Sequence, residues 1–312
     1  MEPRLVCCGL TTLDVVQVVE RVPGPDEKVV ALAGHVAFGG PAANAAATAV
    51  ALGVPTTLVT ALGAGAVAAA ARAGLAARGV EVVDLLDGGA GAWQVPVSTV
   101  LVTAGTGERA VASANGAGLP PDVLARSAAA VLPGVLTGAT CVLVDGHHLG
   151  AAVPVACAAQ ERDVPVLLDG GSWKPGLDRL LRVVDHAVLS AVFTVPAGER
   201  PLGAGAGAAA VDALLDVVAG LGPVTVARSA GAGPVRVRRT GPTGVVREEV
   251  QPPLVPADEV VDTLGAGDVL HGAVAAALAG GAGPVEALRS AVLTAARSVR
   301  HPGALGWADA PG

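Results

Sequence analysis

Aromatic side chains are scarce in this sequence. They make up 2% of the 312 residues, with two phenylalanines, three tryptophans and no tyrosine. Hydrophobic residues nevertheless account for 52% of the chain, and much of that share is alanine. A chain of this length can bury a large core within one α/β domain. We therefore expect valine, leucine and alanine to fill the core.

Positive charge is scarce as well. The 20 lysine and arginine residues are outnumbered by 27 aspartates and glutamates, which gives a formal net charge of −7, and no basic cluster occurs. Nucleic-acid-binding proteins present a basic surface, so that class of function is excluded. A phosphorylated ligand would have to be held by local backbone and a few side chains.

The longest stretch without a charged side chain, residues 29–71, does not predict a membrane helix. Gly39-Gly40-Pro41, Gly53 and Pro55 interrupt it, whereas a spanning helix needs about 20 consecutive, predominantly apolar residues. Arg4 to Cys8 resembles a strand and not the charged start of a signal peptide. We expect a cytoplasmic protein.

Two chemical motifs are missing. The cysteines lack the spacing of metal ligands and lie in apolar segments, which predicts reduced core thiols; they are Cys7, Cys8, Cys141 and Cys157. Gly9-Leu10-Thr11, after the first predicted strand, lacks the G-x-G-x-x-G fingerprint. That absence argues against a dinucleotide-binding oxidoreductase.

What the sequence does contain is a regular alternation of strands and helices from Leu119 onwards. Apolar strands alternating with helices indicate a parallel sheet covered on both faces, with ligands at the carboxyl ends of the strands. Three polar residues, Asp145, Asp169 and Ser190, end such predicted strands. The neighbouring His147-His148 pair is not expected to bind a metal, because adjacent side chains on an extended chain point to opposite faces.

A glycine-rich loop that begins at Val260 leads into a helix predicted from Ala266 to Ala279. The first N–H groups of this helix have no partner within it, and the helix dipole adds positive potential, so the first turn can hold an anion. Asp268 lies in that turn and could take the proton from a hydroxyl that attacks phosphorus. The dipole should also keep its pKa low. The loop alone equally allows an aspartate that only caps its helix.

A second glycine loop, Gly39-Gly40, leads into a helix that starts at Pro41 and ends near Gly53. Asn44 falls in the first turn of this helix. Asp14 follows the first strand, where it could accept hydrogen bonds from hydroxyl groups or merely stabilise a turn. The residues alone leave both interpretations open.

The two loops resemble the signatures of one family. Asp262 to Asp268 is similar to the C-terminal signature of the ribokinase-like, or pfkB, carbohydrate kinases, and Gly39 to Ala47 is similar to their N-terminal signature. The resemblance implies a three-layer α/β/α sandwich with a mostly parallel central sheet. It also implies a single domain, 1–312, with a small β-sheet lid whose strands come from about 14–38 and 93–113.

The resemblance implies roles for individual residues. The catalytic residues would be Asp268, Gly265, Ala266 and Gly267. The substrate-binding residues would be Asp14, Gly39, Gly40, Asn44 and Arg109. The nucleotide contacts would be Ser229, Gly231 and Gly233. Asp262 would help to order a monovalent cation such as K⁺.

The chain departs from the family pattern in one important place. Many relatives carry Asn-x-x-Glu, which organises Mg²⁺ through water, where this chain has Ser190-Ala191-Val192-Phe193. How Mg²⁺ is held is therefore open. Ketohexokinase-like and sulfofructose-kinase-like members resemble the chain most, through segments such as Thr12 to Val15 and Gly40 to Ala43.

The resemblance implies an ATP- and Mg²⁺-dependent kinase acting on a hydroxymethyl group of a sugar, with a ketose such as fructose as the expected substrate. A homodimer through the lid is compatible with it. Two alternatives remain open: a nucleoside kinase, and a non-catalytic protein that binds sugar or nucleotide.

Overall fold

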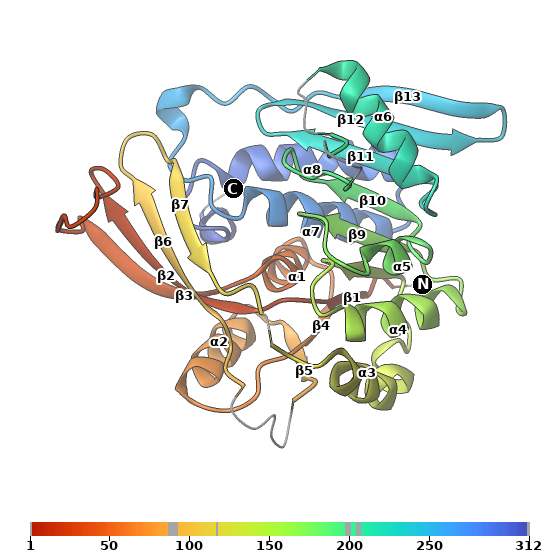
Figure 1. Cartoon of the computed structure of the whole chain (residues 1–312), viewed down its shortest axis with the longest axis horizontal. Helices are drawn as coiled ribbons and strands as arrows, with labels where there is room; N and C mark the ends of the chain where they lie inside the picture. Colours follow the sequence, from red (N-terminus) through yellow and green to blue (C-terminus); the bar gives the residue numbers. More distant parts are fainter. Residues whose placement is uncertain (1, 87–92, 117, 197–200, 204–206, 311–312) are drawn as a thin grey trace.

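The computed structural model describes residues 2–86, 93–116, 118–196, 201–203 and 207–310. A large sheet lies between two layers of helices, and a small sheet projects from one side of it (Figure 1). The part of the chain that the structure describes contains no helix that is long and apolar enough to cross a membrane.

The large sheet is mostly parallel. Its strand order is β13-β12-β11-β10-β9-β8-β1-β4-β5. Neighbours from β11 to β5 pair in parallel, whereas β12 and β13 form an antiparallel edge. The strands are β1 (Leu5–Cys8), β4 (Thr56–Thr60), β5 (Glu81–Asp84), β8 (Cys141–Val144), β9 (Val166–Gly170), β10 (His186–Leu189), β11 (Thr225–Ala230), β12 (Gly233–Gly241) and β13 (Gly244–Val250).

Helices cover both faces of this sheet, because its inner strands are apolar on both sides. Val6 and Cys8 of β1 pack with one layer, and Leu5 and Cys7 pack with the other. The first layer comprises α3 (Pro121–Val135), α4 (Leu149–Gln160), α5 (Leu177–Leu181) and α6 (Ala208–Ala219). The second comprises α1 (Pro41–Ala51), α7 (Ala266–Ala279) and α8 (Pro284–Ser298). The predicted three-layer sandwich is confirmed.

Small side chains let the second helical layer pack tightly. Nearly every residue of α1 is buried, and most of these are alanines. A Cβ atom at Gly272 of α7 would lie 2.5 Å from the carbonyl oxygen of Ala45. Glycine at that position therefore permits the close approach of α7 to α1, which brings the two glycine loops together.

The small sheet has the order β3-β2-β6-β7. β2 and β6 pair in parallel, and the outer pairs are antiparallel. Its strands are β2 (Thr12–Val19), β3 (Ala33–Gly39), β6 (Val97–Thr103) and β7 (Arg109–Ser113), and α2 (Ala66–Ala77) packs against β3.

Several elements differ from the sequence-based expectation. Within the segment 14–38, which was expected to supply lid strands, residues 29–32 are not part of β3, and α5 and the short α9 (Gly306–Asp309) were not predicted. β12 is longer than the short apolar segment, residues 235–237, that would suggest a strand. It begins at Gly233 and continues through Arg238 and Arg239 to Gly241. Salt bridges to α6 compensate two of its arginines, at 3.1 Å between Arg236 and Asp212 and 3.4 Å between Arg238 and Asp216.

Candidate functional site

The loop before α7 has a fixed shape. Gly265 adopts the left-handed conformation with φ 71°, and a Cβ atom there would lie 2.4 Å from the Cβ atom of Ala304. Asp262 is buried, and its two carboxylate oxygens accept hydrogen bonds from the N–H groups of Leu264 and Gly303, both at 2.8 Å. Asp262 thus joins the loop to the turn after α8.

The start of α7 offers unpaired N–H groups. The N–H of Ala266 is 3.4 Å from the carbonyl oxygen of Thr263, so it is weakly engaged. Within the described residues, the N–H groups of Gly265 and Gly267 have no acceptor. Together with the helix dipole, these groups form a site for an anion such as a phosphoryl group.

Asp268 meets Asn44 at this point. The side-chain amide of Asn44 donates a hydrogen bond of 2.7 Å to Oδ2 of Asp268. Asn44 is placed by Gly40, which caps α1 with φ 97° and could not carry a Cβ atom, because that atom would lie 2.4 Å from the carbonyl oxygen of Leu10. Residues 224 positions apart in the sequence are therefore in direct contact.

The pKa of Asp268 is raised. Burial favours the protonated carboxyl, and this effect outweighs the hydrogen bond from Asn44 and the neighbouring His271 and Arg109, which favour the charged form. The sequence-based expectation of a low pKa was wrong, because it considered the helix dipole and left out the desolvation of Asp268 by the surrounding elements.

A cavity of about 350 Å³ opens beside the start of α7. Its polar edge includes five of the predicted residues, Arg109, Ser229, Gly231, Ala266 and Gly267. Most of the remaining wall is apolar and includes Val260, Leu270, Val292, Ala295 and Val299. An apolar pocket with a few polar groups at one end suits a nucleotide base with its phosphates. Gly233 does not line it and instead pairs with Ala230 where β11 turns into β12.

Arg109 of β7 connects the small sheet to the α7 loop. Its guanidinium donates hydrogen bonds to the carbonyl oxygen and the hydroxyl of Thr263, at 2.8 and 3.0 Å. The Thr263 hydroxyl in turn donates to the carbonyl oxygen of Gly107 at 3.1 Å. The β6–β7 turn is thereby docked on the loop, with Arg109 at the edge of the cavity.

Asp14 lies on the face of the small sheet that is turned toward the α7 loop. It shares a face of β2 with Val16, and Val16 packs in a cluster with Leu264. The Thr12 hydroxyl donates a hydrogen bond of 2.7 Å to the Asp14 carboxylate. A Cβ atom at Gly39 would lie 2.0 Å from that carboxylate, so glycine leaves room for it.

Asp145, which the sequence analysis placed only at a strand end, organises the N-terminal loops. Its carboxylate accepts hydrogen bonds from the N–H groups of Leu10 at 2.7 Å, His147 at 2.8 Å and Ala42 at 3.2 Å. Burial would raise its pKa, but His147 and these N–H groups outweigh burial and keep the pKa below its usual range. Asp145 therefore holds the chain just before β2, at Leu10, and just after β3, at Ala42.

His271 is a residue that the sequence analysis overlooked. It lies three positions after Asp268 on α7, is almost fully buried, and its Nδ1 atom is 3.2 Å from Asp169 at the end of β9. The available signal was a polar residue within an otherwise apolar helix.

The described residues directly after β10, 190–196, do not offer a carboxylate for Mg²⁺. The Ser190 hydroxyl donates a hydrogen bond of 2.7 Å to the carbonyl oxygen of Gly171, and Phe193 is fully buried with its ring against Trp173. Among the described residues, no group of three or more histidine, cysteine, aspartate or glutamate side chains could hold a metal ion.

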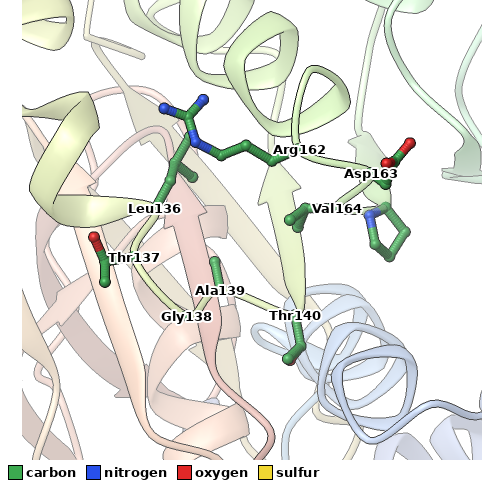
Figure 2. A pocket seen from close by; sticks show the side chains of 9 residues that line it. Leu136, Thr137, Gly138, Ala139, Thr140, Arg162, Asp163 and Val164 are labelled. Atoms are coloured by element: carbon green, nitrogen blue, oxygen red, sulfur yellow. The ribbon is translucent and has the colours of Figure 1, made fainter. Parts of the chain in front are cut away.

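A second cavity, of about 420 Å³, lies at the opposite end of the parallel strands, where β8 and β9 begin (Figure 2). It is lined by residues 136–140 and 162–165. Its charged groups do not converge, since the Arg162 guanidinium is hydrogen bonded to the carbonyl oxygen of Ala158 at 2.6 Å. We therefore place the functional site at the other end of the strands, around the start of α7.

The sequence matches the model of the pfkB family of carbohydrate kinases over residues 2–309. The chain belongs to this family, and it is an ATP-dependent carbohydrate kinase. No curated protein sequence matches it.

Proteins of known structure that share its fold include a plant ribokinase and a bacterial phosphofructokinase-2. Arabidopsis thaliana ribokinase, complexed with ribose and ATP, is 22% identical with a TM-score of 0.70, and the match covers 98% of this chain and 96% of that one. Escherichia coli phosphofructokinase-2 is 21% identical in both of its matching structures. For its tetrameric inhibited form the TM-score is 0.77, and the match covers 95% of this chain and 94% of that one. For its complex with potassium the TM-score is 0.76, and the match covers 97% of this chain and 94% of that one.

Proposed function

We propose that this kinase transfers the γ-phosphoryl group of ATP to a hydroxymethyl group of a ketose, with Asp268 as the general base. The contact between Asn44 and Asp268 carries the proposal, because it joins the two predicted motifs in one place. The raised pKa of Asp268 makes its carboxylate a stronger base than an exposed aspartate.

The acceptor sugar would lie between the small sheet and the start of α7. Asp14, with Gly39, Gly40 and Asn44 around it, would accept and donate hydrogen bonds to the hydroxyl groups. The hydroxyl to be phosphorylated would lie within hydrogen-bond reach of Asp268, which takes its proton as the bond to phosphorus forms. The small sheet would then act as a lid within one domain.

ATP would occupy the apolar cavity, with its phosphates directed toward α7. The N–H groups of Gly265 and Gly267, supported by Ala266, would stabilise the charge on the transferring phosphoryl group. Arg109 would add a positive charge at the edge of the cavity. Ser229 and Gly231 line this cavity, and Gly233 would act only through the shape of the β11–β12 turn.

Mg²⁺ would accompany ATP and neutralise phosphate charge. Ser190 and Phe193 do not fit a magnesium site built on a protein carboxylate, so no proposed step depends on a protein ligand for the ion. For the monovalent cation, Asp262 already satisfies two backbone N–H groups. We therefore propose that it shapes the loop beside a K⁺-type site.

The substrate can be tested with a coupled assay for ADP at saturating ATP–Mg²⁺, using fructose, ribose and a nucleoside. We expect the highest kcat/KM with the ketose. A preference for the nucleoside would support a nucleoside kinase. Thermal stabilisation by ATP and sugar without any ADP release would support a non-catalytic binding protein.

Asp268→Asn tests the base directly. We expect kcat to fall by roughly 10²–10⁴-fold, the usual contribution of a general base, while thermal stabilisation by ATP stays almost unchanged. Asp258→Asn, at an exposed aspartate in the short helix Ala257–Glu259, is the matched control. Near-normal turnover of Asp268→Asn would end the proposal.

A further inference from the structure

Both ring nitrogens of His271 face main-chain carbonyl oxygens. Nδ1 lies 2.6 Å from the carbonyl oxygen of Gly267, and Nε2 lies 3.0 Å from that of Val188. Nδ1 is also 3.2 Å from Oδ2 of Asp169. The His271 and Asp169 side chains are both almost fully buried. Three oxygen atoms therefore surround one imidazole ring away from solvent.

This arrangement suits a ring that is protonated on both nitrogens. A neutral imidazole carries one N–H group, and a carbonyl oxygen can only accept a hydrogen bond. A neutral His271 would therefore direct a lone pair at Gly267 or at Val188. Protonation of both nitrogens removes that repulsion and gives each carbonyl oxygen a donor.

Asp169 provides the matching negative charge. Its Oδ2 atom is buried and has no hydrogen-bond partner among the described residues, although Nδ1 of His271 lies close to it. Burial is the largest influence on both groups: it lowers the pKa of His271, and together with the charges of Asp268 and Asp145 it raises the pKa of Asp169, so these surroundings favour two neutral groups. A charged pair has no net charge, however, and each partner offsets the desolvation of the other.

The pair lies directly behind the proposed base. His271 follows Asp268 by three positions, so both lie on one side of α7. Its Nδ1 also contacts the carbonyl oxygen of the peptide that joins Gly267 to Asp268. We propose that Asp169 and His271 form a buried carboxylate–imidazolium pair that orients Asp268 and sets the electrostatic potential at its carboxylate. This inference rests on the proposed role of Asp268, and His271 is a positioning residue because it acts through Asp268.

Other charged groups also act on Asp268 and Asp169, and these groups are the same in every variant of the test. α1 contributes only the neutral amide of Asn44. The titratable and charged groups that act on Asp268 or Asp169 from the surrounding elements are Arg109 of β7, Asp145 and His147 after β8, and Lys174 after β9.

Charge variants separate an electrostatic role from simple packing. His271→Asn leaves Asp169 without its counter-charge, so the acid limb of the kcat–pH profile should move up by roughly one pH unit. In the double variant Asp169→Asn/His271→Asn both charges are gone, and the limb should return at least halfway to its original position. An unshifted limb in His271→Asn, or a double variant shifted as far as the single one, would overturn the pair.

A second measurement needs neither turnover nor a variant. Nitrogen-15 NMR of the wild-type protein near neutral pH, assigned through bonds to the backbone, should show both ring nitrogens of His271 in the range of protonated imidazole. One nitrogen in the unprotonated range would refute the inference even if the kinase proposal holds. If no sugar is phosphorylated, the proposed function fails, and this spectrum still decides on the pair.

Discussion

Asp268 combines two features that oppose each other at the level of a single residue. The helix start favours its charged form, and burial favours its neutral form, with burial the larger effect. The carboxylate is therefore held in a state that readily accepts a proton. This property suits a general base that must act as phosphoryl transfer proceeds.

The raised pKa of Asp268 predicts a specific pH dependence. Protonated Asp268 cannot act as a base, so kcat should fall as the pH drops through its pKa. We expect this acid limb to lie above about 3.9, the value for an unperturbed aspartate. The measurement is kcat at saturating substrates between pH 4 and 8, with circular dichroism at each pH to show that the protein stays folded. A constant kcat down to pH 4 would contradict the prediction.

Gly265 offers a second test at the residue scale. In Gly265→Ala, the new Cβ atom would meet Ala304 while the backbone is held at a positive φ. We expect a loss of about 1–3 kcal/mol in the free energy of unfolding and a large fall in kcat, because the N–H groups of the loop move.

Denaturant unfolding and steady-state kinetics measure these two effects. Gly283→Ala is the control, because Gly283 also caps a helix but has an ordinary φ of −69° and open space around it. Equal stability of the two variants would show that the Gly265 conformation is not strained by a side chain.

At the scale of elements, the β6–β7 turn is docked on the α7 loop through Arg109 and Thr263. Arg109→Ala should therefore weaken both the phosphate site and the attachment of the small sheet. We expect KM for ATP to rise by roughly tenfold or more, since a charge-assisted hydrogen bond contributes about 1.5–3 kcal/mol. Arg179→Ala, at an exposed arginine of α5, is the control. An unchanged KM for ATP would remove Arg109 from the nucleotide site.

Sequence predicted elements best where local patterns decide the structure. α7 begins and ends where predicted, because the glycine turn and the apolar helix are both local signals. The sequence does not reveal the full length of β12, because its arginines look like loop residues until α6 supplies the opposing carboxylates. The small helix α5 forms through burial of Leu177, Leu180 and Leu181 against the core, which the local pattern does not reveal.

In the candidate site, too, the residues that could be predicted are those that a local pattern identifies. The glycines and Asp268 could be named because each belongs to a contiguous motif. His271 could not, since its meaning depends on Val188 and Asp169, which belong to distant strands. Likewise, the pKa of Asp268 depends on how the folded chain desolvates it, and no short sequence pattern encodes burial.

At the scale of the whole molecule, the outer face of the small sheet is covered by α2 at one end and exposed over the rest. Val36 and Val97 are 59% and 42% exposed, and the strand register places both on the face opposite Val16. This supports the prediction of a homodimer through that sheet. Val36→Lys should shift the protein from dimer to monomer in analytical ultracentrifugation. Leu254→Lys, at a residue 87% exposed outside that sheet, should not. A monomeric wild-type protein would contradict the prediction.

The scarcity of aromatic residues has a practical consequence. Without tyrosine, the intrinsic fluorescence comes from only three indole rings. One of them, Trp307, donates a hydrogen bond of 3.0 Å to the carbonyl oxygen of Ala304, the residue that packs against Gly265. If the loop before α7 takes up a ligand as proposed, the emission of Trp307 should change, and the protein would carry its own optical probe of occupancy.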